Sequence, residues 1–136
     1  MATFTSDSVN GNSAFKPFPS GAVGVRYAKF NVTAAPNAAD VYQMVDIFAG
    51  ETLHDIKIKS SDLDTGSGLV LDVGDATDPD RFLDGSTIGQ AGGVDHEDAN
   101  LAPVTYTADD TIDITCQVAP AGDVATGTLE MWIYIS

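Results

Sequence analysis

The chain has 136 residues, 43% of them hydrophobic, and its 20 acidic and 6 basic residues give a formal net charge of −14. This length and hydrophobic content are enough for one folded domain with a sizeable core. Nucleic acids and anionic membranes are excluded as partners, because both are bound through surfaces rich in Lys and Arg.

Residues 1–24 are predicted to form an extended N-terminal arm. The segment is rich in Ser, Asn, Gly and Pro and shows no sustained hydrophobic period, yet it holds three of the six Phe residues, Phe4, Phe15 and Phe18. Large aromatic side chains in a polar stretch need a surface on which to be buried. Two interpretations stay open: the Phe side chains anchor the arm on a partner, or the segment is a terminal strand on the chain's own sandwich.

The basic residues are unevenly distributed. Residues 1–30 hold three basic residues, Lys16 among them, and one acid, whereas residues 31–136 hold three basic residues and 19 acids. This asymmetry suits an arm that docks on an acidic neighbour, such as another copy of the chain. With only three basic residues in the segment, chance is the alternative.

Residues 25–136 are predicted to form the folded domain, because hydrophobic residues recur there with a period of two. Six short segments before and between the turns read as strands. They are 25–33 (VRYAKFNVT), 41–48 (VYQMVDIF), 54–60 (HDIKIKS), 69–74 (LVLDVG), 81–85 (RFLDG) and 103–107 (PVTYT).

The segment LDTGS, residues 63–67, has two interpretations. It resembles the catalytic loop of a dimeric aspartic protease, in which Asp64 would share a proton with its counterpart. However, the preceding residues KSSD are polar, whereas the protease loop follows a buried strand. As a tight turn, the segment needs only that Asp64 accepts a backbone hydrogen bond and that Gly66 adopts a positive φ.

Seven aspartates fall between Asp62 and Asp84, a density that raises the question of a calcium site. Their spacing does not match the helical calcium loop, and solvated turn residues explain them better. His96, within DHED, reads as a surface residue. No nucleophile, base and acid stand at a recognisable spacing, so we expect no catalytic residues, no cofactor and no metal.

Two strands near the C-terminus alternate clearly. TIDITCQV places Ile112, Ile114, Cys116 and Val118 on one face, where the single cysteine would be buried and inert. GTLEMWIYIS places aromatic residues, Trp132 and Tyr134, on the face opposite its aliphatic residues, and we expect that face to meet a neighbouring subunit. The whole pattern predicts an all-β chain, an antiparallel β-sandwich that is jelly-roll-like, with an extended N-terminal arm.

The series SSDLDTGSGLVLDVGDATDPDRFLDGSTIGQAGG (60–93) and YTADDTIDIT (106–115) resembles small β-sandwich virion proteins of tailed bacteriophages, the capsid decoration or cement family. The resemblance extends from Ala34 onward, with Leu83 where the family carries Ile, and leaves the N-terminal segment unmatched. In this family the DTG residues belong to a turn.

The resemblance implies a function: binding to the outer surface of the assembled head, where the protein ties capsomers of the major capsid protein together, commonly as a homotrimer. We expect a component of the virion that is assembled in the host cytoplasm, in keeping with the absence of a secretory signal pattern in MATFTSDSVNGNS. The candidate residues for contact with the capsid or another subunit are Phe4, Phe15, Lys16, Phe18, Trp132 and Tyr134.

Two alternatives remain open. A head-fibre or tail-associated domain could bind host surface glycans, with Trp132 or Tyr106 as a platform for sugar rings. A dimeric aspartic protease would instead use the DTGS loop.

Overall fold

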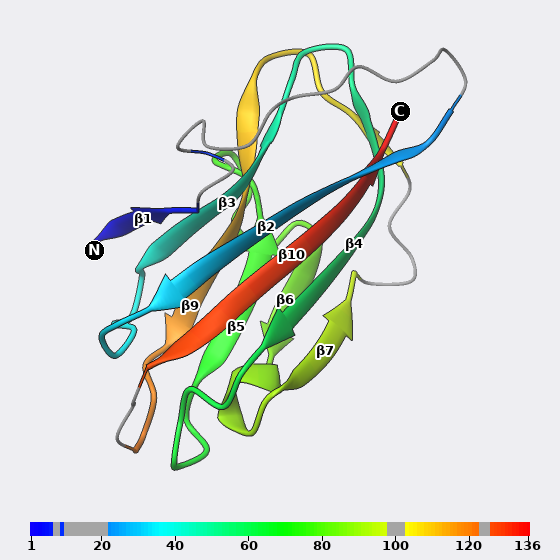
Figure 1. Ribbon diagram of the computed structural model, residues 1–136. Helices are drawn as coiled ribbons and strands as arrows, with labels where there is room; N and C mark the ends of the chain where they lie inside the picture. Colours follow the sequence, from blue (N-terminus) through cyan, green and yellow to red (C-terminus); the bar gives the residue numbers. More distant parts are fainter. Residues whose placement is uncertain (7–8, 10–21, 98–102, 123–125) are drawn as a thin grey trace.

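A computed structural model describes residues 1–6, 9, 22–97, 103–122 and 126–136. The described residues form two packed β-sheets, with sheet B lying in front of sheet A in Figure 1. Sheet A has the strand order β1 (Thr3–Thr5), β3 (Val41–Ile47), β9 (Asp110–Val118), β5 (Val70–Gly74) and β6 (Leu83–Ser86). Sheet B has the order β2 (Gly24–Val32), β10 (Gly127–Ile135), β4 (Thr52–Ser60) and β7 (Gly93–His96). A short β8 (Val104–Thr105) pairs with β4, and a single 3-10 turn, η1 (Ile88–Gln90), precedes β7.

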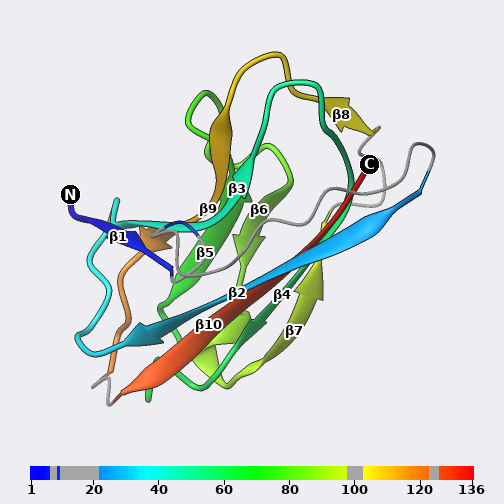
Figure 2. The same ribbon diagram turned by 45° about the horizontal axis from the view of Figure 1, so that its top comes forward.

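Strand pairing is antiparallel except between β1 and β3, which run parallel. The view in Figure 2 shows the two layers and places β1 beside β3, at one edge of sheet A. Ser6 continues this edge, because its N–H donates to the carbonyl of Gln43 at 2.9 Å and its hydroxyl donates to the carbonyl of Met44. The first six residues are therefore attached to the sandwich.

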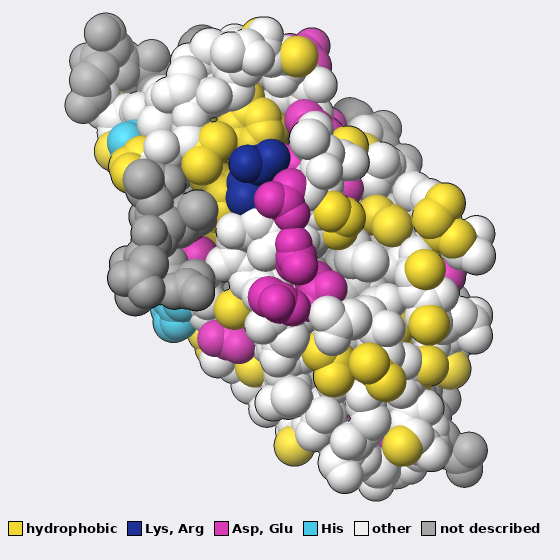
Figure 3. Space-filling model, turned by 180° about the vertical axis from the view of Figure 1, so that it is seen from behind, with side chains coloured by type: hydrophobic (Ala, Val, Ile, Leu, Met, Phe, Trp, Pro, Cys, Tyr) yellow, Lys and Arg dark blue, Asp and Glu magenta, His cyan; other side chains and the backbone are white. Residues whose placement is uncertain are grey.

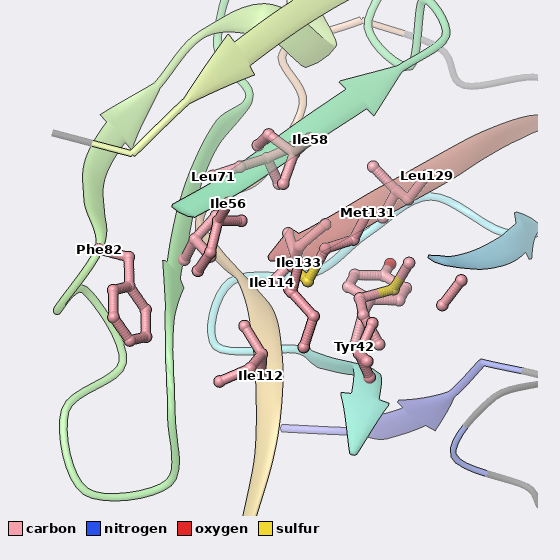
Figure 4. Packing of buried hydrophobic residues seen from close by; sticks show 14 of the residues in the cluster. Tyr42, Ile56, Ile58, Leu71, Phe82, Ile112, Ile114, Leu129, Met131 and Ile133 are labelled. Carbon is pink, nitrogen blue, oxygen red and sulfur yellow. The ribbon is translucent and has the colours of Figure 1, made fainter. Parts of the chain in front are cut away.

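The core lies between the sheets and follows from the alternation of the strands. Alternate residues of β10 (Leu129, Met131, Ile133 and Ile135) are at most 1% exposed. They point toward residues of sheet A such as Ile112, Ile114 and Leu71 (Figure 4). Cys116 is also fully buried, and burial raises the pKa of its thiol to about 11. The predicted inner faces of these two C-terminal strands are confirmed except at Val118, which is 45% exposed at the end of β9, where the pairing with β5 shifts register.

Strand β3 departs from simple alternation. Its pairing with β9 shifts register between Gln43 and Val45, so Met44 and Val45 are both fully buried although they are adjacent. A bulge of this kind places two residues of one strand opposite one residue of its neighbour. Sequence periodicity alone does not locate such a shift.

The prediction of a β-sandwich is confirmed, and the finer jelly-roll description stays a prediction. The eight expected strand segments all contain observed strands, and β7 was not expected. Strand β1 agrees with the second interpretation of the N-terminal segment, a terminal strand on the chain's own sandwich. No helix within the described residues is long and apolar enough to cross a membrane.

Candidate functional site

The LDTGS loop connects β4 of sheet B to β5 of sheet A, and its aspartate is buried. Asp64 is 2% exposed, and its carboxylate accepts five backbone N–H groups. The donors are Gly66, Gly68, Leu69, Ala121 and Gly122, at 2.8 to 3.1 Å. The last two belong to the connection that returns the chain from β9 to β10. Asp64 therefore joins two crossovers between the sheets.

These hydrogen bonds determine the ionisation of Asp64. Burial alone would raise its pKa, but the backbone N–H groups of Gly122, Gly68, Leu69 and Ala121 outweigh burial and hold the pKa well below its usual range. A carboxylate that is so weakly basic and already occupied by five donors is poorly suited to activate water. The turn interpretation of LDTGS is thus the one that the geometry supports.

The glycines around Asp64 are needed for close approach of the two connections. A Cβ at Gly66 would lie 3.0 Å from the Cβ of Ala121, and a Cβ at Gly68 would lie 2.8 Å from the same atom. Gly66 was expected to have a positive φ, but it is not among the glycines that do. The sequence correctly marks a glycine here, but its cause is packing against the β9–β10 connection.

A second buried carboxylate, Asp75, organises the turn after β5. It accepts hydrogen bonds from Arg81 Nε at 2.7 Å and from the Tyr106 hydroxyl at 2.9 Å. Burial alone would raise the pKa of Asp75, but the hydrogen bonds from Arg81 and Tyr106 lower it. Tyr106 is itself only 8% exposed. The suggestion that Tyr106 offers a platform for sugar rings is therefore wrong.

The acidic stretch from Asp62 to Asp84 is divided among several local structures. Asp64 and Asp75 serve the two turns described above, and Asp72 accepts the backbone N–H of Gly85 at 2.9 Å. Among the described residues, no group of three His, Cys, Asp or Glu side chains is arranged to hold a metal ion.

The outer face of sheet B carries the two aromatic residues singled out from the sequence. Trp132 and Tyr134 of β10 lie between β2 and β4 and are half-buried. Directly opposite Trp132 stand Tyr27 on one side and Lys57 on the other. We call this surface the lysine-aromatic face, formed by Tyr27, Lys29, Lys57, Lys59, Trp132 and Tyr134.

Contacts across the strands order this face. The Lys57 Nζ lies 4.6 Å from the centre of the Trp132 ring, a cation–π contact, and the Tyr27 and Trp132 ring centres are 5.1 Å apart. The Tyr27 hydroxyl donates to Glu130, and this hydrogen bond is the main cause that raises the pKa of Tyr27 to about 12. The face is thus a preformed aromatic surface on which three lysines alternate with two acids: Glu130 lies between Lys29 and Lys59, and Asp55 lies opposite Tyr134.

The opposite side of the sandwich is acidic. No strand of sheet A contains Lys or Arg. Asp72 and Asp84 share the side-chain amide of Gln117, which lies 3.2 and 3.3 Å from their oxygens. Figure 3, seen from behind, shows Asp and Glu side chains in a line that runs down this side from beside a patch of Lys or Arg. We call it the acidic face, formed by Asp72, Asp80, Asp84 and Asp113.

Two members of the acidic face, Asp113 and Asp72, are nearly buried. Asp113 is 5% exposed and accepts the Thr111 hydroxyl at 2.6 Å. Burial, the largest effect, raises the pKa of Asp113 to about 7, and the charges of Asp110 and Asp75 act in the same direction. This carboxyl therefore titrates near neutral pH.

The candidate contact residues of the N-terminal segment fall into two groups. Phe4 packs on the sandwich itself, stacked on Tyr42 with ring centres 4.9 Å apart and 5.6 Å from the centre of Phe30. Phe15, Lys16 and Phe18 lie outside the described residues. The predicted arm and its contact with a capsid stay predictions, and the contact described for Phe4 is intramolecular.

The residues that the sequence reading missed are the neighbours of Trp132. Tyr27 and Lys29 alternate along β2, and Lys57 and Lys59 alternate along β4, so each pair shares one face of its strand. That alternation was a usable signal. What it could not supply was the pairing of both strands with β10, which brings these side chains to Trp132.

Solved phage capsid structures contain chains with this fold. A chain in the capsid of Ralstonia phage GP4 is 25% identical and has a TM-score of 0.77, covering 98% of this chain and 97% of that chain. A chain in the capsid asymmetric unit of cyanophage Pam1 is 22% identical, with a TM-score of 0.68 over 91% and 94% of the two chains. One in the acidic stable capsid of Helicobacter pylori bacteriophage KHP30 is 14% identical, with a TM-score of 0.58 over 82% and 86%. Neither a protein-family model nor a curated protein sequence matches the chain.

The fold therefore places the chain in a class: small β-sandwiches of the kind found in phage capsid structures. In the GP4 capsid the similarity spans nearly the full length of both chains, so it concerns the entire sandwich and not one motif. The resemblance to phage virion proteins noted in the sequence is supported at this level.

Proposed function

We propose that the chain is a capsid decoration protein, which binds the outer surface of an assembled phage head and stabilises the contacts between capsomers of the major capsid protein. The observation that carries the proposal is the full-length similarity to a chain in the capsid of Ralstonia phage GP4. A structural role also agrees with the state of Asp64, whose carboxylate is engaged by five backbone donors.

The physical basis of such a role is linkage. A protein that binds the assembled shell but not its loose subunits stabilises the shell by mass action. Several weak contacts made by one oligomer reinforce one another through their high effective concentration. Under this proposal the protein acts as a homotrimer, with Trp132 and Tyr134 at the contact between copies and the segment that holds Phe15, Lys16 and Phe18 on the shell.

The sandwich is less well suited to the alternative of a glycan-binding fibre domain. A sugar-binding platform needs an open aromatic ring face, and the two aromatic residues considered for it are Trp132 and Tyr106. Lys57 Nζ lies over the ring of Trp132, and Tyr106 is buried against Asp75. Decoration of the head therefore remains the function that we favour.

The test is a binding assay with heads of the cognate phage prepared without this protein. We expect saturable binding to the assembled heads, no binding to loose major capsid subunits, and a higher temperature of DNA release from decorated heads. If the purified protein assembled into closed shells by itself, it would instead be the major shell protein. Absence of binding to heads would overturn the proposal.

The arm is tested separately in the same assay. A truncated protein that lacks residues 1–21 should lose most of its head binding if this segment attaches the protein. Because residues 3–6 pair with β3, a second variant, Phe15→Ala with Phe18→Ala, keeps the described edge of sheet A intact. Unchanged occupancy for this double variant would contradict the role of the arm.

A further inference from the structure

The charges of the chain are segregated between the two sheets. Sheet A contains five aspartates and no Lys or Arg in its strands, whereas the strands of sheet B contain four of the six basic residues of the chain. The strands of sheet B also contain three acids, Asp55, Asp95 and Glu130. Three lysines, Lys29, Lys57 and Lys59, lie on one outer face, and the acids Asp55 and Glu130 share that face.

The lysine-aromatic face also exposes apolar surface. On this side of sheet B, Val25 is 50% exposed, Tyr27 is 43% exposed, and Val94 of β7, opposite Lys59, is 46% exposed. Exposed apolar and aromatic side chains are typical of a protein interface. The three lysines among them favour an acidic partner.

The acidic face offers the complement. Asp80 and Asp84 are exposed, and Asp72 lies beside Asp84 because both accept from Gln117. The repulsion within this group is visible in the raised pKa of Asp80, caused first by a hydrogen bond with Asp78 and further by the charges of Asp84 and Asp72. Cations from a partner would relieve this repulsion.

We propose that the lysine-aromatic face of one copy docks on the acidic face of a second copy, so that the chains associate head to tail. The two faces lie on opposite sides of the sandwich (Figures 1 and 3), so one copy can use both at the same time. Such a heterologous contact closes into a ring when its rotation permits and otherwise extends. The proposed function adds one expectation, that the ring contains three copies; the contact itself does not rest on that function.

The contact predicts a specific pattern of charge-reversal variants. Lys57→Glu with Lys59→Glu makes both faces of a copy acidic, and Asp80→Lys with Asp84→Lys makes both faces basic. Each double variant should associate with itself at least about tenfold more weakly than the original chain. An equimolar mixture should recover association, because each face then meets a complementary one.

The measurement is molar mass by light scattering across a range of protein concentrations, at low and at high salt. We expect an original chain whose mass exceeds that of one copy and falls as salt rises, two variants of single-copy mass, and a mixture of larger mass. Thr107→Lys with Ala108→Lys adds positive charge at an exposed turn outside both faces and should leave the mass unchanged. Circular dichroism verifies that every variant is folded.

Three outcomes would overturn the contact: an original chain that stays a single copy at low salt, variants that associate normally, or a mixture that does not recover. No phage heads take part in this experiment. If the variant mixture associates but the protein does not bind heads, the proposed function is overturned and this contact is retained. If the protein binds heads but the mixture does not associate, this contact is overturned and the proposed function is retained.

Discussion

The two sheets are alike on the inside and different on the outside. Both bury a continuous aliphatic surface, exemplified by Ile114 in sheet A and Ile133 in sheet B, which are fully buried. Outside, sheet A presents aspartates without any Lys or Arg, and sheet B presents lysines around Trp132. Close packing imposes the same requirement on the inner surfaces of both sheets. The difference in charge is therefore confined to the outer surfaces.

The largest effect should come from breaking the joint between the sheets. Asp64→Ala removes the acceptor of five backbone N–H groups at the two crossovers. Since buried donors without partners are costly, we expect this variant to lose most of its stability and to be recovered largely unfolded. Chemical denaturation followed by tryptophan fluorescence measures the change.

Asp64→Asn is the matched control, because it keeps an acceptor for Gly66 and Gly122 at Oδ1 and loses the one at Oδ2. It should fold with a stability between those of the original chain and Asp64→Ala. Since the pKa of Asp64 is lower in the folded chain than its ordinary value of 3.8, its contribution is present above pH 3.8 and is lost as the pH falls below it. Equal stability of all three proteins at neutral pH would show that the joint is unimportant.

The next effect tests the similarity of the two inner surfaces. Ile114→Ala in sheet A and Ile133→Ala in sheet B each leave a cavity in a fully buried position and should each cost about 2–5 kcal/mol of unfolding free energy. Urea denaturation gives both values. Costs that differ by more than this range would mean that one sheet contributes far more of the core than the other.

A smaller effect separates the outer surfaces by pH. The pKa of Asp113 is raised to about 7 from an ordinary value of 3.8, so the folded chain holds a proton there that the unfolded chain releases. Stability is therefore full below about pH 3.8 and declines as the pH rises toward 7. Asp113→Asn removes this decline and should be more stable than the original chain by about 1–2 kcal/mol at pH 8, after allowance for solvent screening.

The same variant should match the original chain near pH 4, where both are uncharged at this position. Asn keeps the oxygen that accepts the Thr111 hydroxyl. Thermal unfolding at several pH values gives the comparison. A stability difference that does not change with pH would exclude titration of Asp113 as its cause.

The smallest effect concerns the lysine-aromatic face. Lys57→Met retains the aliphatic stem but removes the charge over the Trp132 ring, and should cost about 0.5–1 kcal/mol. A double-mutant cycle with Trp132→Leu isolates the coupling between the two side chains. A coupling energy of zero would indicate that the face is organised by strand pairing alone.

Much of the fold was predictable from the sequence because local alternation records burial. The segments TIDITCQV and GTLEMWIYIS identified the inner residues of β9 and β10 correctly, except for Val118, which is exposed at the end of β9. A terminal strand was one of two interpretations of the N-terminal segment, but the position of β1 was not identified, since three residues, Thr3–Thr5, are too few to show a period. Strand β7 begins with glycine and has only four residues, so it reads as a turn.

The candidate sites were predictable in part for the same reason. Alternation placed Trp132 on the outer face of its strand, but the cation above its ring comes from Lys57, which lies far away in the sequence. Likewise, the glycine spacing of LDTGS marked a turn around Asp64, whereas its partners Ala121 and Gly122 depend on the approach of a distant connection. Side-chain direction is local information, and strand pairing is not.

The position of β10 has a consequence for the order in which the molecule forms. It is a central strand of sheet B, between β2 and β4, yet it follows every other strand in the chain. The pairing of β2 with β10 therefore joins segments that are roughly one hundred residues apart, and non-local contacts of this kind slow folding. Before β10 pairs with β2 and β4, the lysine-aromatic face is not assembled, so a partly folded chain lacks this surface.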